Sequence, residues 1–463
     1  MNKSIDISTI KTVYFIGIGG IGMSALARYF HSIGCVVSGY DRTPTLLTFE
    51  LEAEGILVHF DEIGTYISKA TDLVIYTPAV PMSHPAYAAA ERQNLPLLKR
   101  AEILGILSEN YRTLAFAGTH GKTTTSTMAA HIMHHGKMGC SAFLGGISKN
   151  YQSNLLIHPT SKWLVTEADE YDRSFLQLSP EIAIITSIDA DHLDIYGDYH
   201  SLCLAFTQFA SKIKERGTLI VKKPVLRKIK KQDHYQIFTY GIRDESLDFR
   251  AINIRYQNAN ACFDLEYPGG IISDIHPGIP GKVNIENAVA AAAGALIAGF
   301  SEQEIKTGIE SFKGIRRRFD LQYESEDVVY IDDYAHHPEE IKALVESVRE
   351  IYPHKKITGL FQPHLFTRTR DLVDEFAMSL SMLDEVLLMP IYAARELPIK
   401  GVSSEIILER IINKPARIIK INELENFLTT DFSGVFLSIG AGDIDKLTHK
   451  ITEILSKNPS EKK

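Results

Sequence analysis

Residues 118–123 read Gly-Thr-His-Gly-Lys-Thr, a set of residue types that suits the binding of nucleotide phosphates. In such loops backbone N–H groups surround the phosphates, the lysine (Lys122) reaches the terminal phosphate, and the following hydroxyl (Thr123) can bind Mg²⁺. The common loop has four residues between its glycines, whereas this one has two, which narrows the class of loop. We predict an ATP site in which the remaining loop contacts come from Gly118, Thr119, His120, Gly121 and Thr124.

Two apolar segments that follow the loop end in acidic side chains and a histidine. Glu167 and Asp169 come directly after one of them, and Asp189, Asp191 and His192 come after the next. Taken singly, each would more commonly be a surface acid or a core histidine. The carboxyl ends of parallel strands meet at one edge of a sheet, where a phosphate loop also lies. We therefore predict that Thr123, Glu167 and His192 bind a shared Mg²⁺, with Mn²⁺ as the alternative ion.

A second glycine loop lies a hundred residues earlier. Gly17-x-Gly19-x-x-Gly22 follows an apolar run and opens a helical pattern, and Asp41 closes the next apolar run. This is the fingerprint of a dinucleotide-binding unit, in which glycines let the backbone approach a pyrophosphate and the acid meets a sugar hydroxyl. A nicotinamide dinucleotide and a UDP-sugar both satisfy that description, so a dehydrogenase remains an alternative on this loop alone.

Apolar runs of four to six residues alternate with helical patterns along most of the chain, which predicts parallel sheets with crossover helices. The pattern restarts twice, near "TLAFAG" at residue 113 and near "DVVYIDD" at residue 327. A length of 463 residues exceeds what one core usually serves. We predict an α/β protein of three domains, covering residues 1–110, 111–318 and 319–463.

The composition excludes several other classes of protein. The net charge of −8 gives no electrostatic reason to expect nucleic-acid binding. The four cysteines are widely spaced, which supports neither a disulfide framework nor a zinc site. No run reaches the roughly 18 apolar residues that a membrane span needs. The alanine-rich run at residues 287–300 comes nearest, and we predict that it is a helix packed closely on a sheet. We expect a cytoplasmic protein that does not insert into membranes.

The two loops occur together with six further segments: "EADEYDRSF", "DADHLDIYG", "RRRFD", "DDYAHHP", "FQPHLFTRTRDL" and "SIGAGDI". This combination resembles the Mur ligases over essentially the whole chain. The resemblance implies a Rossmann-like first domain for the UDP part of the substrate, a central P-loop domain for ATP and a Rossmann-like third domain for an amino acid. It also implies that L-alanine is joined to the lactyl carboxylate of UDP-N-acetylmuramate through an acyl phosphate, in peptidoglycan precursor synthesis. We expect a monomer or a weak homodimer.

The resemblance also implies roles for particular residues. His120 would face the muramyl group and would be catalytic, together with Lys122, Glu167, His192 and His336. The UDP-sugar would contact Gly19, Gly20, Gly22, Met23, Ser24, Asp41, Thr77 and Arg100. Beyond the loop, ATP would contact Asn284, Asn287, Arg317, Arg318 and Asp333. The amino acid would contact His337, His364, Arg368 and Arg370, because a guanidinium fork suits a carboxylate.

Three departures from the family pattern bear on the prediction. Lys282 and Val283 stand where the adenine-binding helix usually begins Arg-His. No lysine occurs between Lys162 and Lys212, so we predict a site without the carbamylated lysine of sibling ligases. Tyr171 replaces the more common serine, and a tyrosine also occurs in the related ligase that attaches a recycled tripeptide to UDP-N-acetylmuramate. That ligase is therefore an alternative.

Overall fold

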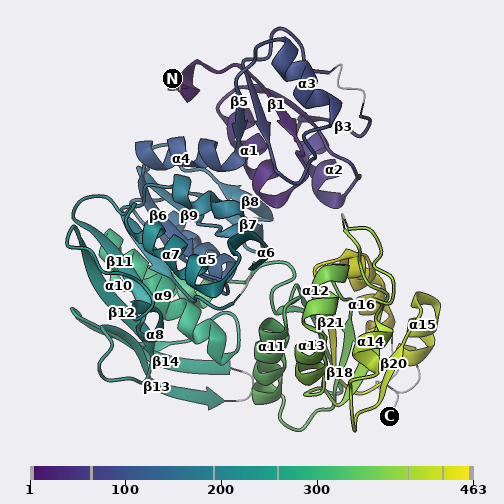
Figure 1. Ribbon diagram of the computed structural model, residues 1–463. Helices are drawn as coiled ribbons and strands as arrows, with labels where there is room; N and C mark the ends of the chain where they lie inside the picture. Colours follow the sequence, from purple (N-terminus) through teal and green to yellow (C-terminus); the bar gives the residue numbers. More distant parts are fainter. Residues whose placement is uncertain are drawn as a thin grey trace. The chain divides into compact units, whose positions relative to one another are not determined.

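The computed structural model describes residues 5–62, 66–190, 193–257, 260–394, 396–429 and 432–457. The strands form three sheets of five, ten and six strands (Figure 1). The chain divides into two compact units, one of residues 1–253, 263–276 and 286–312 and one of residues 254–262, 277–285 and 313–463. The predicted α/β architecture with three mostly parallel sheets is confirmed. The boundaries at residues 110 and 318 stay a prediction.

The first sheet has the order β3-β2-β1-β4-β5, and all of its strands are parallel. The central strand β1 is buried along almost its whole length, as expected for a parallel strand covered on both faces. Strands β2 and β3 follow on one side of β1, and β4 and β5 follow on the other, so the direction of strand order reverses at β1. Ligands of such sheets bind in the crevice at the end of the strand where the order reverses. The elements are η1 (Ile7–Thr9), β1 (Thr12–Ile16), α1 (Ile21–Ser32), β2 (Val36–Tyr40), α2 (Leu46–Ala53), β3 (Leu57–His59), β4 (Leu73–Tyr76), α3 (Pro85–Arg92), β5 (Leu97–Lys99) and α4 (Arg100–Asn110).

The second sheet has the order β15-β14-β13-β12-β11-β10-β6-β9-β7-β8. Its middle strands are parallel, and the pairs β7–β8 and β14–β15 at its two ends are antiparallel. The strands are β6 (Arg112–Ala117), β7 (Ser141–Ser148), β8 (Ser153–Leu156), β9 (Trp163–Glu167), β10 (Ile182–Ile185), β11 (Gly217–Lys222), β12 (Tyr235–Ile242), β13 (Phe249–Gln257), β14 (Asn260–Tyr267) and β15 (Gly270–Ile275).

Helices cover this sheet, and the alanine-rich one packs closely on it. The predicted helix over residues 287–300 is α9 (Lys282–Ala298), whose alanines have almost no exposed surface. A Cβ atom at Gly294 would lie 3.0 Å from Ile184 Cδ1 and 3.2 Å from Leu114, so small residues are needed there. The other helices are α5 (Lys122–His135), η2 (Tyr171–Gln177), α6 (Leu193–Tyr196), α7 (Tyr199–Ala210), α8 (Lys223–Leu226) and α10 (Glu302–Ser311).

The third sheet, in the second unit, has the order β16-β17-β21-β18-β19-β20, with only the β16–β17 pair antiparallel. Two separate apolar clusters pack around its strands. The elements are β16 (Asp320–Glu324), β17 (Val328–Asp333), α11 (Pro338–Ile351), β18 (Ile357–Phe361), α12 (Phe366–Asp371), α13 (Val373–Leu380), β19 (Glu385–Leu388), α14 (Glu405–Leu408), β20 (Ala416–Ile418), α15 (Ile421–Thr429), β21 (Gly434–Ile439), η3 (Asp443–Leu447) and α16 (Thr448–Ser456).

Within the described ranges, each helix is too short or too polar to cross a bilayer. All four cysteines carry free thiols.

Candidate active site

The first glycine loop connects β1 to α1, and two predicted substrate residues lie against its glycines. Gly17 has a φ of +89°, and a Cβ atom there would lie 2.5 Å from Thr77 Cγ2 at the end of β4. A Cβ atom at Gly22 would lie 2.5 Å from Nη1 of Arg100, the first residue of α4. The backbone angle of Gly17 therefore favours glycine there, whereas a side chain at position 22 would have to displace the Arg100 guanidinium.

Asp41, predicted to contact the UDP-sugar, binds the loop itself. Its Oδ2 accepts a hydrogen bond of 2.7 Å from the Gly19 N–H. Gly20 is the N-cap of α1, and the side chains of the next predicted contacts, Met23 and Ser24, are buried. Contacts of Met23 and Ser24 to a substrate would have to come from the main chain. The role of all these residues in binding a UDP-sugar stays a prediction.

The second glycine loop connects β6 to α5 and adopts backbone angles that favour glycine. The φ values of Gly118 and Gly121 are +132° and +80°. A Cβ atom at Gly118 would overlap the Thr186 hydroxyl, which donates to the carbonyl of His120. The next residue, Ser187, bonds Thr119 Oγ1 at 2.8 Å and accepts from the His120 N–H at 2.9 Å. Residues just after β10 therefore set the shape of the loop.

Lys122 is the first residue of α5, and its ammonium is held within the loop. It donates to the Gly118 carbonyl at 2.7 Å and to the two carboxylate oxygens of Glu170 at 2.9 and 2.8 Å. Burial is the largest single influence and acts to lower the pKa of Lys122, but the carboxylates of Glu170, Asp169 and Glu167 together raise that pKa. The lysine is therefore a cation that these hydrogen bonds fix beside the loop.

Glu170 has no exposed surface, and its role was not found from the sequence, although it lies in the same "EADE" segment as Glu167. Its carbonyl accepts a hydrogen bond of 2.5 Å from the Tyr196 hydroxyl of α6. Glu170 thus joins the lysine of the loop to the short helix that follows "DADH". The signal in the sequence was a second glutamate three residues after the first, directly behind an apolar strand.

The predicted metal ligands lie at the carboxyl edge of the second sheet. Glu167 ends β9 and pairs in register with Phe116 of β6, the strand that leads into the loop and Thr123. A Cβ atom at Gly145 of β7 would overlap the Glu167 carboxylate, so this glycine leaves the space that the carboxylate fills. His192 and Asp191 lie outside the described residues. The ligand set stays a prediction.

His120 and Asn287 lie beside the same loop. His120 Nε2 is 3.8 Å from the Asp189 carboxylate, which also comes from the segment after β10. Asn287 Oδ1 accepts from the Thr125 hydroxyl at 3.1 Å, and a Cβ atom at Gly121 would lie 3.2 Å from it. The structure therefore brings Asn287 to the first turn of α5. Asn284, in the second unit, donates to the Pro280 carbonyl at 2.6 Å.

A group of charged and aromatic residues lies at the carboxyl edge of the third sheet. The Asp333 carboxylate accepts from the N–H groups of Phe319 and Ala335 at 2.6 and 2.8 Å, and burial raises its pKa to about 6. Arg317 and Arg318 both lie over the Tyr334 ring, at 4.8 and 4.9 Å.

Arg317 is held within its own unit. It donates to the carbonyls of Gly440 and Gly442 at 2.6 and 3.1 Å and pairs with Asp445 at 3.1 Å. Arg318 lies 4.0 Å from Glu340. Contacts of these two arginines with ATP stay a prediction.

Three of the residues predicted to serve the amino acid or the reaction lie together. The His364 ring is 5.9 Å from the ring of His336, and its Nδ1 is 3.5 Å from Nη1 of Arg368. Burial lowers the pKa of His336. Tyr392, which the sequence did not single out, stacks on His364 at 5.9 Å. This group offers a cation, an imidazole pair and an aromatic wall to a small zwitterion.

Two other predicted residues have different contacts. His337 is the N-cap of α11 and shares a capping box with Glu340. Arg370 pairs with its neighbour Asp371 at 2.6 Å, and about half of its side chain is exposed. Residues two apart on a helix face different directions, so Arg368 and Arg370 are not equivalent.

Comparison with known sequence families explains this arrangement. The domain family described as "Mur ligase family, catalytic domain" matches residues 12–112, the "Mur ligase middle domain" residues 116–295, and "Mur ligase, glutamate ligase domain" residues 317–433. The chain belongs to the Mur ligase family. Curated Mur ligases include a protein from Phocaeicola vulgatus named UDP-N-acetylmuramate–L-alanine ligase, which is 47% identical over 98% of this chain and 100% of its own. One of the same name from Porphyromonas gingivalis is 48% identical over 96% and 99%.

Solved Mur ligases share the fold. The UDP-N-acetylmuramate-alanine ligase MurC of Thermotoga maritima is 28% identical, covers 96% of this chain and 98% of its own, and superposes with a TM-score of 0.81. A murein peptide ligase from Psychrobacter arcticus, 21% identical over 96% and 99% of the two chains, has a TM-score of 0.69 and shows the shared fold alone.

Proposed function

We propose that the chain is an ATP-dependent ligase that joins L-alanine to the lactyl carboxylate of UDP-N-acetylmuramate. The observation that carries this proposal is the near full-length similarity, at 47–48% identity, to proteins named for that activity. The geometry agrees, because the chain has two glycine loops in different sheets, one suited to a diphosphate that stays intact and one to ATP. We place the reaction in the cytoplasm, where ATP is available.

A carboxylate does not condense with an amine in neutral water, because it would have to expel an oxide-like leaving group. Phosphorylation solves this problem. The lactyl carboxylate attacks the γ-phosphorus of ATP, the bond to the bridging oxygen breaks, and ADP leaves. Lys122 offsets the charge that develops on the phosphoryl oxygens, and backbone N–H groups of the loop hold the phosphates in line for transfer.

The described residues fit a hard divalent cation at the same edge of the sheet. The Thr123 hydroxyl and the Glu167 carboxylate are oxygen donors of the kind that Mg²⁺ prefers, and Mn²⁺ accepts them too. When bound, the ion would neutralise phosphate charge and orient the phosphates of ATP. Gly145 would contribute by leaving room for the Glu167 carboxylate.

In the second half of the reaction, the neutral amine of L-alanine attacks the carbonyl carbon of the acyl phosphate and forms the C–N bond. The C–O bond to phosphate then breaks, and the nitrogen loses one proton, which the departing phosphate can accept. Arg368 is the guanidinium best placed to hold the amino-acid carboxylate, because it lies beside His364 rather than in an ion pair on the surface. Tyr392, stacked on His364, would limit the size of the amino-acid side chain.

The proposal is tested by phosphate release from ATP in the presence of Mg²⁺. Release should require both UDP-N-acetylmuramate and L-alanine, and the product should be the amide. Full turnover with either one missing would overturn the proposal. Binding of NADH, followed by its fluorescence, separates it from the dehydrogenase suggested by the first loop alone.

Tyr171 motivates a competition experiment within the family. Turnover is compared with L-alanine, glycine, L-serine and the recycled tripeptide as amine substrates. We expect L-alanine to have the highest kcat/KM, with the tripeptide inactive. Preference for the tripeptide would reassign the chain to the recycling ligase.

A further inference from the structure

Asn154 lies in β8, at the end of the ten-stranded sheet, and has no exposed surface. Its side chain makes three hydrogen bonds, all to α1, the helix that begins at the first glycine loop. Nδ2 donates to the Ile21 carbonyl at 2.6 Å and to the Ser24 hydroxyl at 2.9 Å. Oδ1 accepts from Arg28 Nη1 at 2.5 Å. Both amide hydrogens and the amide oxygen are therefore used on one helix.

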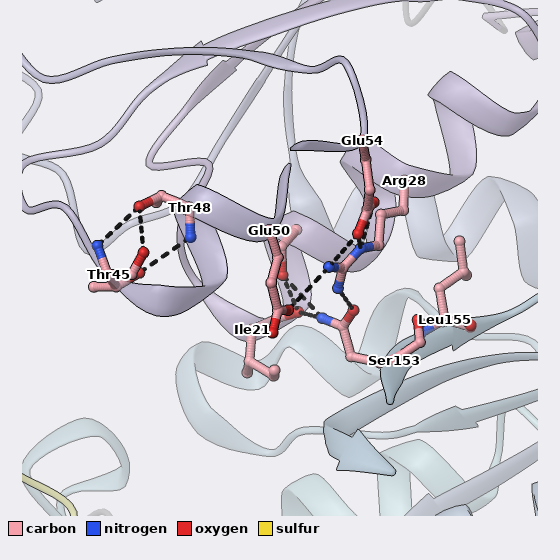
Figure 2. A network of polar contacts seen from close by, with 10 residues as sticks. Ile21, Arg28, Thr45, Thr48, Glu50, Glu54, Ser153 and Leu155 are labelled. Atoms are coloured by element: carbon pink, nitrogen blue, oxygen red, sulfur yellow. Dashed lines mark hydrogen bonds and ion pairs between the residues drawn. The ribbon is translucent and has the colours of Figure 1, made fainter. Parts of the chain in front are cut away.

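The helix face that meets Asn154 is itself held in place. Figure 2 shows Arg28 between Glu50 and Glu54, with the Ser153–Leu155 segment of β8 opposite. Arg28 is 7% exposed and bonds Glu54 through Nε at 2.8 Å and through Nη2 at 2.6 Å. It also contacts Glu50 at 3.3 Å. Arg28 is thus held by Glu50 of α2 and by its C-cap residue Glu54, and the same guanidinium donates to Asn154.

Apolar packing surrounds this polar contact but does not fix the position of α1 along β7 and β8. α1 packs against β7 and β8, and the rings of Tyr29 and Phe143 lie 5.7 Å apart. Apolar contact is non-directional and tolerates sliding, whereas an amide with three partners permits one position only. Asn154 therefore supplies directional contacts between α1 and the ten-stranded sheet.

The position of α1 matters for the proposed reaction, on which this inference rests. Ile21 and Ser24 lie in the first turn of α1, next to the predicted seat of the diphosphate. The carboxylate at the far end of the same substrate has to meet the γ-phosphate above Lys122, in the sheet that carries Asn154. Rates of such transfers fall steeply with misplacement, on the order of 100-fold for an ångström.

We propose that Asn154 is a positioning residue. It sets the distance between the predicted diphosphate-binding site at the start of α1 and the phosphate loop between β6 and α5. It touches neither nucleotide. Its removal should leave each substrate able to bind and should impair the step in which the two substrates meet.

The test compares Asn154→Ala and the isosteric Asn154→Asp with the parent protein. Asp keeps the volume but replaces two donors by an acceptor that faces the Ile21 carbonyl. Ser153→Ala is the matched control. Among the described residues, the Ser153 hydroxyl bonds only within its own strand, to the Leu155 carbonyl and N–H at 3.0 and 3.1 Å. Each protein is assayed for kcat at saturating substrates, for Kd of UDP-N-acetylmuramate alone, for Kd of a non-hydrolysable ATP analogue, and for thermal midpoint.

The expected result is a fall in kcat of about 10-fold to 100-fold in the Asn154 variants, with both Kd values within about threefold of the parent and Ser153→Ala unchanged. A kcat within twofold of the parent would overturn the inference. So would a loss of UDP-N-acetylmuramate affinity with kcat retained, since Asn154 would then only shape the loop. If Asn154→Ala does not fold, Asn154→Asp decides alone. A parent protein without ligase turnover contradicts the proposed function instead, so the two failures are distinct.

Discussion

The Lys122 ammonium donates to both carboxylate oxygens of Glu170, at 2.9 and 2.8 Å, and Glu170 has no exposed surface. A buried charge pair of this kind is strongly coupled, because loss of one partner leaves the other charge in a poorly solvated site. Removing Lys122 should therefore affect both stability and turnover, and the two effects can be separated.

We predict that Lys122→Met abolishes phosphate release and lowers the free energy of unfolding by about 3–5 kcal/mol, because Glu170 is left uncompensated. The double variant Lys122→Met, Glu170→Gln should regain most of the stability and remain inactive. Urea unfolding and phosphate release measure the two quantities. Binding of UDP-N-acetylmuramate should persist in both variants, since it uses the other loop. A single variant as stable as the parent would contradict the pairing.

Gly145→Ala should weaken the binding of the Mg²⁺ that supports turnover. The new Cβ atom would overlap the Glu167 carboxylate and displace it. By analogy with changes beside other metal ligands, the Mg²⁺ concentration for half-maximal turnover should rise about 10-fold to 100-fold. The KM for UDP-N-acetylmuramate should stay within about twofold. Turnover measured over a Mg²⁺ series checks this, and an unchanged Mg²⁺ dependence would exclude a role for Glu167 in metal binding.

Arg368→Ala and Arg370→Ala should differ, although the residues are two apart in α12. Arg368 lies beside His364, whereas Arg370 pairs with Asp371 at the surface. Loss of a charge-assisted hydrogen bond to the amino-acid carboxylate is worth about 1.5–3 kcal/mol, so the KM for L-alanine should rise about 10-fold to 100-fold in Arg368→Ala. Arg370→Ala should stay near the parent value. Equal effects would mean that both arginines reach the substrate.

His131 should contribute to acid sensitivity. It is 1% exposed, its ring nitrogens lie 2.8 Å from the Tyr151 hydroxyl and 2.9 Å from that of Ser311, and burial, aided by His135 and His134, lowers its pKa to about 4. The unfolded chain, with a histidine pKa of 6.5, binds the proton more readily, so this contribution to stability is present above pH 6.5 and is lost as the pH falls toward 4.

The linkage gives a measurable difference. At pH 5 the free energy of unfolding of the parent should be about 2 kcal/mol lower because of His131. His131→Gln has no imidazole and cannot show this loss. The cost of His131→Gln should therefore be about 2 kcal/mol smaller at pH 5 than at pH 7.5, as measured by the free energy of unfolding. A cost that grows toward acid pH would mean that the buried imidazole is charged.

The sequence was sufficient for the elements that carry local signals. The loops at Gly17 and Gly118, and the strand ends at Glu167 and Asp333, follow from residue spacing within short windows and from the rule that strand ends share an edge. α9 was predicted because its alanine run is too short for a membrane and suits close packing on a sheet.

The remaining features depend on contacts between distant residues. Gly145 was invisible because its role requires β7 to lie beside β9, and Asn154 because its partners are more than a hundred positions away. Glu170 could have been noticed from its motif, but its pairing with Lys122 needs the fold. Helical periodicity alone indicates that Arg368 and Arg370 face different directions, because they are two residues apart in α12.

The packing of α1 on β7 and β8 also concerns how the chain avoids self-association. β8 is the last strand of its sheet, and a strand in that place is a template for pairing with another molecule. Synthesis runs from the amino terminus, so α1 leaves the ribosome more than a hundred residues before β8 does. We expect α1 to be available for packing on β7 and β8 when β8 emerges, which would shorten the time for which this edge strand is exposed during synthesis.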